Sequence, residues 1–376
     1  MKILPAFPVA VMLFVAGAVL PVAARADDQS NAVARDFPEA SASVMDKLEA
    51  LHAKYGVSAL LVAIAKGDGE PVLGAAGTSM SGVPASTDMH YRMGAMAIAS
   101  LTTILLQLVD ENVVSLDDTI DNWLPEYPDA DKVTLRMLAD SSSGYADYIS
   151  APQFTDAFYE DVFYEWSDRE LLDVAFEQGM QFEPGTDFLY AHTNFIVLGQ
   201  ALGAATGKPY ETLLQDRIVD RLDLMQTKIW TTAELPDPPL HAFTTERGIL
   251  EDSTYWSPSW TSYTGSLNGD LADTAKLMRA VATGETISDE SLAEMKAETN
   301  VGFGPMTPDR YFGLGMEFVA PWIQKTFAFG GYGGTAGYLA SEDVTLVVVI
   351  THGAKSDIDT NPSAPIFKEI SSMLGY

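Results

Sequence analysis

The pattern of apolar and polar residues predicts one sheet built from both ends of the chain, with helices between them. Apolar residues occupy nearly every face of residues 95–114, which indicates a helix buried on all sides. Residues 40–55 have helical spacing and stop at Gly56, a residue typical of helix ends. The apolar runs 57–65 and 71–77, separated by a glycine-containing turn, predict a β-hairpin.

The rest of the chain extends this pattern. Asn112 suits a left-handed cap after the long helix. Aromatic residues gather in an acidic segment before residue 182 and again in a loop around Trp256 and Trp260. Further helices are predicted at 168–178, 194–206, 270–282 and 364–374, and further strands at 327–330, 337–340 and 344–350.

The composition is that of a folded protein with an acidic surface. Of 376 residues, 47% are apolar and 10% aromatic, enough for a large core in one domain or two closely packed ones. The formal net charge of −30 repels nucleic acid and anionic membranes. Cysteine is absent, which excludes disulfides and thiolate ligands. No metal-binding spacing of histidines occurs, and we predict neither a metal nor a cofactor.

The first residues have the pattern of a secretory signal. Lys2 precedes an apolar run at residues 3–20, and Ala24-Arg25-Ala26 is a small-residue cleavage site. We predict a signal peptide over residues 1–26, cleaved near Ala26, and a flexible segment over residues 27–40. The mature protein is then periplasmic or secreted, with no membrane insertion. The alternative is an uncleaved anchor, although prolines interrupt the apolar run.

Residues 91–102 are central to the functional interpretation. They read Tyr-Arg-Met-Gly-Ala-Met-Ala-Ile-Ala-Ser-Leu-Thr, where the first strands give way to the long helix. Other short motifs follow in a fixed order: Leu116-Asp117-Asp118, Ser143-Gly144, Phe182-Glu183-Pro184-Gly185-Thr186, Tyr190-Ala191-His192, Tyr311-Phe312-Gly313-Leu314-Gly315 and Gly333-Gly334-Thr335-Ala336-Gly337-Tyr338. This order resembles the serine β-lactamase-like, penicillin-binding-protein-like family. That family includes class C β-lactamases, D-alanyl-D-alanine carboxypeptidases and esterases.

The resemblance implies an α/β plus all-α fold. Its parts are an antiparallel sheet flanked by helices and a mainly helical second domain, with a ligand cleft between them. On this basis we assign residues 41–90 and 262–376 to the α/β domain and residues 91–261 to the mainly helical domain.

The resemblance also implies a Ser-x-x-Lys pair at the start of the long helix. In the family the serine is acylated and the lysine takes its proton. Here Ala95 stands at the serine position and Ile98 at the lysine position. None of the chain's lysines has a serine three residues before it, so the motif has not moved elsewhere.

Two more elements differ from the family pattern. Tyr190 keeps the family's tyrosine, which is a base in many relatives, but His192 replaces the asparagine two residues later. In the third element, Gly331 stands where the family has Lys or His, and we expect Tyr332 to add bulk near the cleft.

The backbone part of the family's site does not depend on these side chains. The resemblance assigns the two oxyanion donors of the site to backbone amides. Such donors need no side chain and can persist when side chains differ. The predicted cleft residues are Ala95 and Gly334, which carry those amides, with Ser142, Tyr332 and Trp256.

These observations favour a non-hydrolytic pseudoenzyme that binds a peptide-like or ester-like small molecule, or a protein partner, in the interdomain cleft. The alternative is a hydrolase, lyase or isomerase whose rebuilt site uses Tyr190 and His192 as acid and base, with His192 activating water or a hydroxyl from residues 141–143. Two other interpretations stay open. Either Met96, Ile98 and Tyr332 fill the cleft as ordinary core, or the acidic aromatic surface binds a partner. The oligomeric state also stays open.

Overall fold

The computed structural model describes residues 37–376, apart from residues 231, 355 and 357–359. The predicted signal peptide over residues 1–26, and the flexible segment up to residue 36, lie outside the described residues. Among the helices that are described, none is both long enough and apolar enough to cross a membrane.

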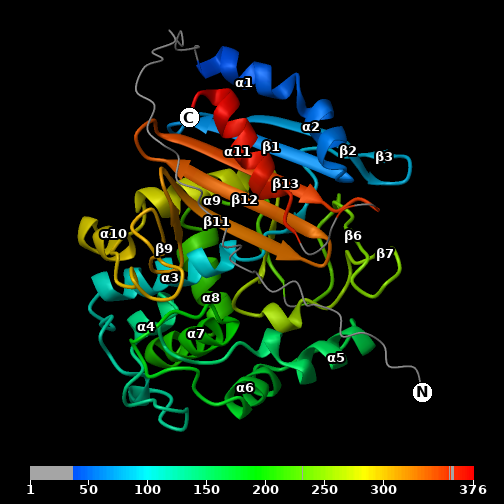
Figure 1. Cartoon of the computed structure of the whole chain (residues 1–376). Helices are drawn as coiled ribbons and strands as arrows, with labels where there is room; N and C mark the ends of the chain where they lie inside the picture. The colour runs from blue at the N-terminus through cyan, green and yellow to red at the C-terminus, as the bar shows by residue number, and fades with distance from the viewer. Residues whose placement is uncertain (1–36, 231, 355, 357–359) are drawn as a thin grey trace, which may run out of the picture.

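An eight-stranded antiparallel sheet forms the centre of the molecule (Figure 1). Its order is β3-β2-β1-β13-β12-β11-β10-β9. The first and last parts of the chain meet where β1 pairs with β13, with Leu61 opposite Val349. This pairing confirms the prediction of a sheet built from both ends. The strands are β1 (Ala59–Lys66), β2 (Val72–Met80), β3 (Val83–Pro84), β9 (Arg310–Phe312), β10 (Glu317–Val319), β11 (Trp322–Phe329), β12 (Tyr332–Leu339) and β13 (Val344–Thr351).

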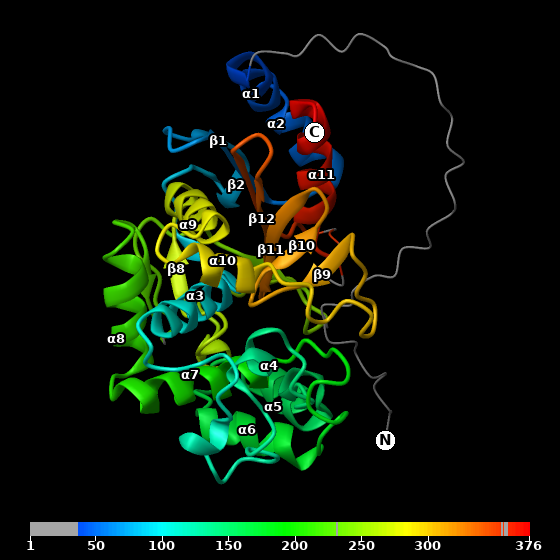
Figure 2. The same cartoon turned by 90° about the vertical axis from the view of Figure 1, so that its left-hand side faces the viewer.

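Helices cover both faces of this sheet (Figures 1 and 2). On one face lie α1 (Phe37–Met45), α2 (Leu48–Tyr55) and α11 (Ser363–Leu374). On the other face lie α9 (Leu271–Thr283), which contacts β1, β12 and β13, and α3 (Met96–Asp110), which contacts β11. Beyond α3, a layer made mainly of helices forms the other half of the molecule (Figure 2). The predicted fold class is therefore confirmed, whereas the predicted domain boundaries stay predictions.

The remaining elements are short. The helices are α4 (Leu135–Ala139), α5 (Pro152–Glu160), α6 (Asp168–Glu177), α7 (His192–Thr206), α8 (Tyr210–Leu214) and α10 (Asp289–Met295). The helical turns are η1 (Ile120–Asn122), η2 (Tyr148–Ser150), η3 (Gln215–Val219) and η4 (Ser259–Thr261), and the short strands are β4 (Tyr91–Arg92), β5 (Lys228–Ile229), β6 (Phe243–Thr244), β7 (Glu251–Asp252) and β8 (Leu267–Gly269).

Helix α3 is buried on every side from Met96 to Leu108, as its sequence predicts. Its buried hydroxyls are satisfied locally: Ser100 donates to the carbonyl of Met96 at 3.0 Å, and Thr102 and Thr103 likewise bond to carbonyls of the preceding turn. Gln107 instead donates to the Arg217 carbonyl and to the Thr286 hydroxyl. A polar group buried without a partner is costly, so this local bonding lets the helix lie entirely in the core. Asn112, just beyond the helix, has a φ of 57°, which confirms the predicted left-handed conformation.

Strand β12 starts earlier than the sequence indicates. The predicted strand at 337–340 is thus extended by residues 332–336, which contain two adjacent glycines. Gly334 lies opposite Phe327 of β11, and a Cβ atom at Gly334 would come within 1.9 Å of the Phe327 ring. The glycine is thus required because an aromatic ring from the neighbouring strand covers it.

Candidate functional site

The start of α3 lies directly against strand β11. Gly94 has a φ of 47°, and a Cβ atom at this position would come within 2.8 Å of the Cβ atom of Phe327. The absence of a side chain at Gly94 therefore allows the chain to turn into α3 beside the strand. Ala95 follows at the helix start and is 7% exposed.

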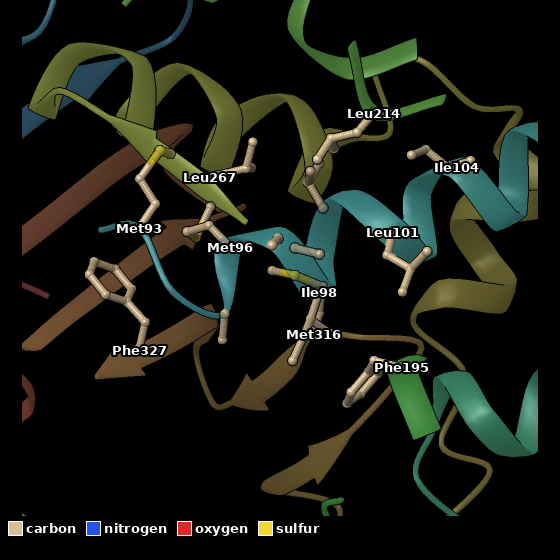
Figure 3. Close-up of a cluster of buried hydrophobic side chains, with 14 of the residues drawn as sticks. Met93, Met96, Ile98, Leu101, Ile104, Phe195, Leu214, Leu267, Met316 and Phe327 are labelled. Carbon is tan, nitrogen blue, oxygen red and sulfur yellow. The ribbon is translucent and has the colours of Figure 1, made fainter. Parts of the chain in front are cut away.

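Ile98 lies one helical turn further, in the apolar core. It has no exposed surface and belongs to the same buried cluster as Met96, Phe195 and Met316. Figure 3 shows Ile98 within this cluster. Neither Ala95 nor Ile98 carries a nucleophilic or titratable atom, so the helix start contributes only backbone groups to the site.

A histidine–aspartate pair stands at the start of α7. Nδ1 of His192 lies 3.1 Å from Oδ2 of Asp147, and the His192 amide donates to Oδ1 of the same carboxylate at 3.2 Å. The Ile149 amide donates to that Oδ1 as well, at 3.3 Å, because Asp147 caps η2. A carboxylate only accepts hydrogen bonds, so Nδ1 is the donor. In the neutral ring Nε2 is then the acceptor, which is the arrangement of a general base.

Tyr190 is placed to donate a hydrogen bond rather than to act as a base. Its ring makes an edge contact with His192, with 5.3 Å between ring centroids. Burial raises the pKa of Tyr190 well above its usual value of 10.0, and Glu317 and Asp147 raise it further. The phenol therefore keeps its proton at neutral pH.

These residues border a pocket of about 140 Å³. Aromatic rings make up much of its wall, and they pack on one another: Trp260 stacks on Phe329 at 5.6 Å between centroids. Polar groups come from Asp147, Ser150, Thr155, His192 and Glu246. The full lining is Asp147, Ile149, Ser150, Phe154, Thr155, Phe158, Tyr159, Tyr190, His192, Glu246, Trp256, Trp260, Ala328, Phe329 and Gly330.

A second, smaller cavity adjoins this pocket at the start of α3. Its volume is about 30 Å³, and Gly94, Ala95 and Arg92 line it. It shares Tyr190, His192, Trp260, Ala328 and Phe329 with the larger pocket. The two spaces are therefore neighbouring parts of one site.

Some of the predicted cleft residues lie in this site and others do not. The structure brings together Ala95, Tyr190, His192 and Trp256, which all line one or both cavities. Ser142 is buried outside both linings, where its hydroxyl donates to Asp140 at 2.6 Å. Its neighbours at positions 141 and 143 are buried and line neither cavity.

The predicted third element, which begins at Gly331, lies in the β11–β12 turn and in β12, the strand that pairs with β11. Gly331 is in the β11–β12 turn, where its φ is 89° and a Cβ atom would come within 2.4 Å of the Phe243 carbonyl oxygen. Tyr332 is buried on β12 and donates to the Leu240 carbonyl, and Gly334 pairs within the sheet; neither lines the cavities. The strand that borders the cavities is β11, through Ala328 and Phe329.

The family model described as Beta-lactamase matches residues 44–364, which is most of the chain. This protein belongs to the beta-lactamase family. A putative D-alanyl-D-alanine carboxypeptidase of Salmonella agona (strain SL483) is 24% identical over 318 residues, covering 75% of this chain and 72% of the relative. A shorter match, 20% identical, covers 41% of this chain and 34% of penicillin-binding protein 4* of Bacillus subtilis (strain 168).

Solved structures of the same fold are similar over most of their length. A D-stereospecific amidohydrolase from Streptomyces sp. has a TM-score of 0.75 at 25% identity, with 84% of this chain and 96% of that chain covered. D-amino acid amidase from Ochrobactrum anthropi SV3, in complex with L-phenylalanine amide, has a TM-score of 0.76 at 22% identity, covering 90% and 97%.

This beta-lactamase family member also holds a buried lysine that the sequence analysis missed. Lys325 on β11 is 1% exposed, and its Nζ has no hydrogen-bond partner among the described residues. The ammonium lies 4.7 Å from the ring centre of Phe312 and 5.7 Å from that of Tyr190. Burial lowers its pKa from 10.5 to about 8, and Glu317 opposes this only in part.

Neither Lys325 nor Asp147 is among the site residues predicted from the sequence, and the sequence signals for the two differ. Ile323, Lys325 and Phe327 alternate along β11, so period-two spacing alone indicates that the lysine shares a buried face with its apolar neighbours. Asp147 carries a weaker signal, because an aspartate before a helical turn is a common cap. Nothing in the sequence indicates that it reaches His192, which lies 45 residues away.

Replacing Lys325 by methionine is expected to stabilise the protein at neutral pH. The Lys325 side chain stays protonated up to about pH 10.5 in the unfolded chain but only up to about pH 8 in the folded chain. Stability therefore rises with pH between these values, as the folded lysine becomes neutral. At pH 7, Lys325→Met should raise the free energy of unfolding by about 3 kcal/mol, and the gain should vanish near pH 10.5.

Urea unfolding from pH 7 to pH 10.5 measures this effect. Lys228→Met, at an exposed position of β5, is the control and should change stability by less than about 0.5 kcal/mol. A loss of stability in Lys325→Met at pH 7 would contradict the account, because it would mean that the ammonium has a favourable partner.

Proposed function

We propose that this beta-lactamase family member binds a small peptide-like or amide-like molecule beside Ala95 without forming an acyl-enzyme. One observation carries the proposal: the positions of the nucleophile and its base hold Ala95 and the fully buried Ile98, while Ala95 still lines a cavity that adjoins a pocket of about 140 Å³. A pocket that persists without the reacting atoms retains the means to bind but not to acylate.

The relatives support this ligand class. Their names refer to a D-alanyl-D-alanine carboxypeptidase, a D-stereospecific amidohydrolase and an amidase in complex with L-phenylalanine amide. These names refer to an amide bond, to a dipeptide or to an amino acid amide. The proposal extends to a periplasmic or secreted location, which rests on the signal-like pattern of residues 1–26.

Covalent labelling tests the absence of an acyl-enzyme. The protein is incubated with a fluorophosphonate or a penicillin and examined by intact-mass spectrometry. We expect no stoichiometric adduct, because Ala95 offers no hydroxyl where the family has its nucleophile. Stoichiometric labelling of any serine would contradict the proposal.

Binding is followed separately through tryptophan fluorescence, because Trp256 and Trp260 line the pocket. Phenylalanine amide should give a saturable change. Ala328→Phe, which adds a ring to the pocket wall, should weaken binding at least tenfold while the protein stays folded. If neither amino acid amides nor short peptides change the fluorescence, the ligand-binding part of the proposal is wrong.

A second candidate function is supported by the Asp147–His192 pair. With Nδ1 bonded to the carboxylate, Nε2 can accept a proton from water, and Tyr190 can donate one to a leaving group or carbonyl. Such a site hydrolyses a reactive amide or ester by direct attack of water. This is the rebuilt site expected from the sequence, with Asp147 added.

Substitution of His192 tests this candidate. Turnover of esters, D-amino acid amides and lactams should fall by about 10²–10⁴-fold in His192→Gln, because a general base contributes on that order. Ser150→Ala is the control, since Ser150 lines the same pocket but its hydroxyl only bonds the Asp147 carbonyl oxygen. If the unmodified protein shows no turnover above buffer, this candidate fails and the binding proposal is unaffected.

A further inference from the structure

Arg92 is a buried cation without a counter-ion. Its side chain is 1% exposed, and Nη2 donates to three carbonyl oxygens, those of Ala233, Thr254 and Trp256. Nε and Nη1 have no hydrogen-bond partner among the described residues, and no described carboxylate forms an ion pair with the guanidinium. The guanidinium carbon also lies 4.9 Å from the ring centre of Phe329, so carbonyl oxygens and a ring face stabilise the charge in part, but no carboxylate balances it.

The lack of a partner is unusual in this protein. The chain carries 52 acidic residues against 22 basic ones, so carboxylates are plentiful. Unlike Arg92, five described arginines form ion pairs with carboxylates nearer the surface. They are Arg136, Arg169, Arg217, Arg247 and Arg279. Arg92 and Lys325 are thus two buried cations that form no ion pair with a described carboxylate, and Arg92 lines the cavity at the start of α3.

Arg92 lines the cavity of about 30 Å³ at the start of α3. A cavity needs roughly 10–15 Å³ to hold one water molecule, so this one has room for a polar group somewhat larger than water. The Ala95 amide also stands at this helix start and has no hydrogen-bond partner within the described chain. A backbone N–H at the start of a 15-residue helix favours an anion.

The rest of the wall adds one donor. Tyr190 lines the same cavity as a neutral phenol, and a phenol can donate to an anion. Two carboxylates act on Tyr190 from outside the lining, Glu317 and Asp147. Both oxygens of Asp147 accept hydrogen bonds from His192, and Glu317 accepts from Thr326. The lining of the small cavity itself supplies hydrogen-bond donors and one positive charge and includes no carboxylate.

The larger pocket next to it fits one aromatic ring. Its volume of about 140 Å³ is close to that of a cavity of about 150 Å³ that accommodates benzene. Rings form most of its wall, among them Phe154, Phe158 and Trp256. Because the two spaces share five residues, a ligand with a ring at one end and a small anionic group at the other reaches both.

We propose that the site binds an aromatic carboxylate, with its ring in the pocket and its carboxylate in the cavity beside Arg92 and the Ala95 amide. This inference rests on the proposed function and names its ligand class. A carboxylate is also what hydrolysis of an amide or ester releases. The ligand is thus equivalent to the product of the relatives' reaction rather than to their substrate.

Three ligands of the same shape test this inference in the unmodified protein: 3-phenylpropionate, 3-phenylpropionamide and 3-phenylpropylammonium. Binding is measured by tryptophan fluorescence and calorimetry. We expect the carboxylate to bind at least tenfold more tightly than the amide, and the ammonium ion not to bind. The ligand series needs no substitution, so it is independent of whether a variant folds.

Two variants then assign the effect to Arg92. Arg92→Met should bring the affinity for the carboxylate down to that for the amide, and Arg92→Lys, which keeps the charge, should restore part of the difference. Both are checked for a cooperative unfolding transition, because Arg92 also holds three carbonyl groups.

The outcomes separate this inference from the proposed function. Equal binding of carboxylate and amide, tighter binding of the ammonium ion, or no binding of any of the three overturns the inference. Binding of the amide alone overturns the inference and leaves the proposed function standing. Covalent labelling of a serine overturns the proposed function whatever the three affinities are.

Discussion

Helix α3 lies between the sheet and the helical layer, in contact with β11, α7, α8, α9 and α10, and residues 96–108 have almost no exposed surface. The site depends on this packing. Its floor is the start of α3, and any side chain on the inner turns of the helix must fit a closed apolar space. Ile98 meets this condition without cost. A lysine at the same place would need a network of polar partners, and the cluster around Ile98 consists of apolar side chains.

The polar groups of the site come from other elements. Asp147 caps η2, His192 begins α7, Lys325 belongs to β11 and Arg92 to β4. Two of these are buried cations without counter-ions in a strongly acidic protein. Buried unpaired charge destabilises a fold and is common where a ligand or a reaction uses it. The site beside Ala95 is therefore not a purely apolar cleft.

The sequence was sufficient for the fold but only in part for the site. Helix α3, the pairing of β1 with β13 and the helix stops at Gly56 and Gly207 follow from apolar periodicity and glycine positions, which are local properties. The Asp147–His192 pair depends on the packing of two distant segments, which periodicity does not report.

The glycines of the third element show a different limit. A glycine pattern fixes where close packing occurs but not which strand faces the site. In the structure, the strand next to Ala95 is β11, and Gly331 and Gly334 lie beyond it. Residues at the cavity, such as Phe329, could not be assigned without the pairing of β11 with β12.

The central claim is that the family's lysine position has become part of the core. Urea unfolding of Ile98→Lys against Ile98→Met tests it most directly. Ile98→Met keeps the apolar volume and should cost less than about 1.5 kcal/mol, whereas Ile98→Lys should cost about 3 kcal/mol or more, because it buries an ammonium group without partners. If Ile98→Lys is as stable as Ile98→Met, polar partners for a lysine still exist around α3, and the claim is wrong.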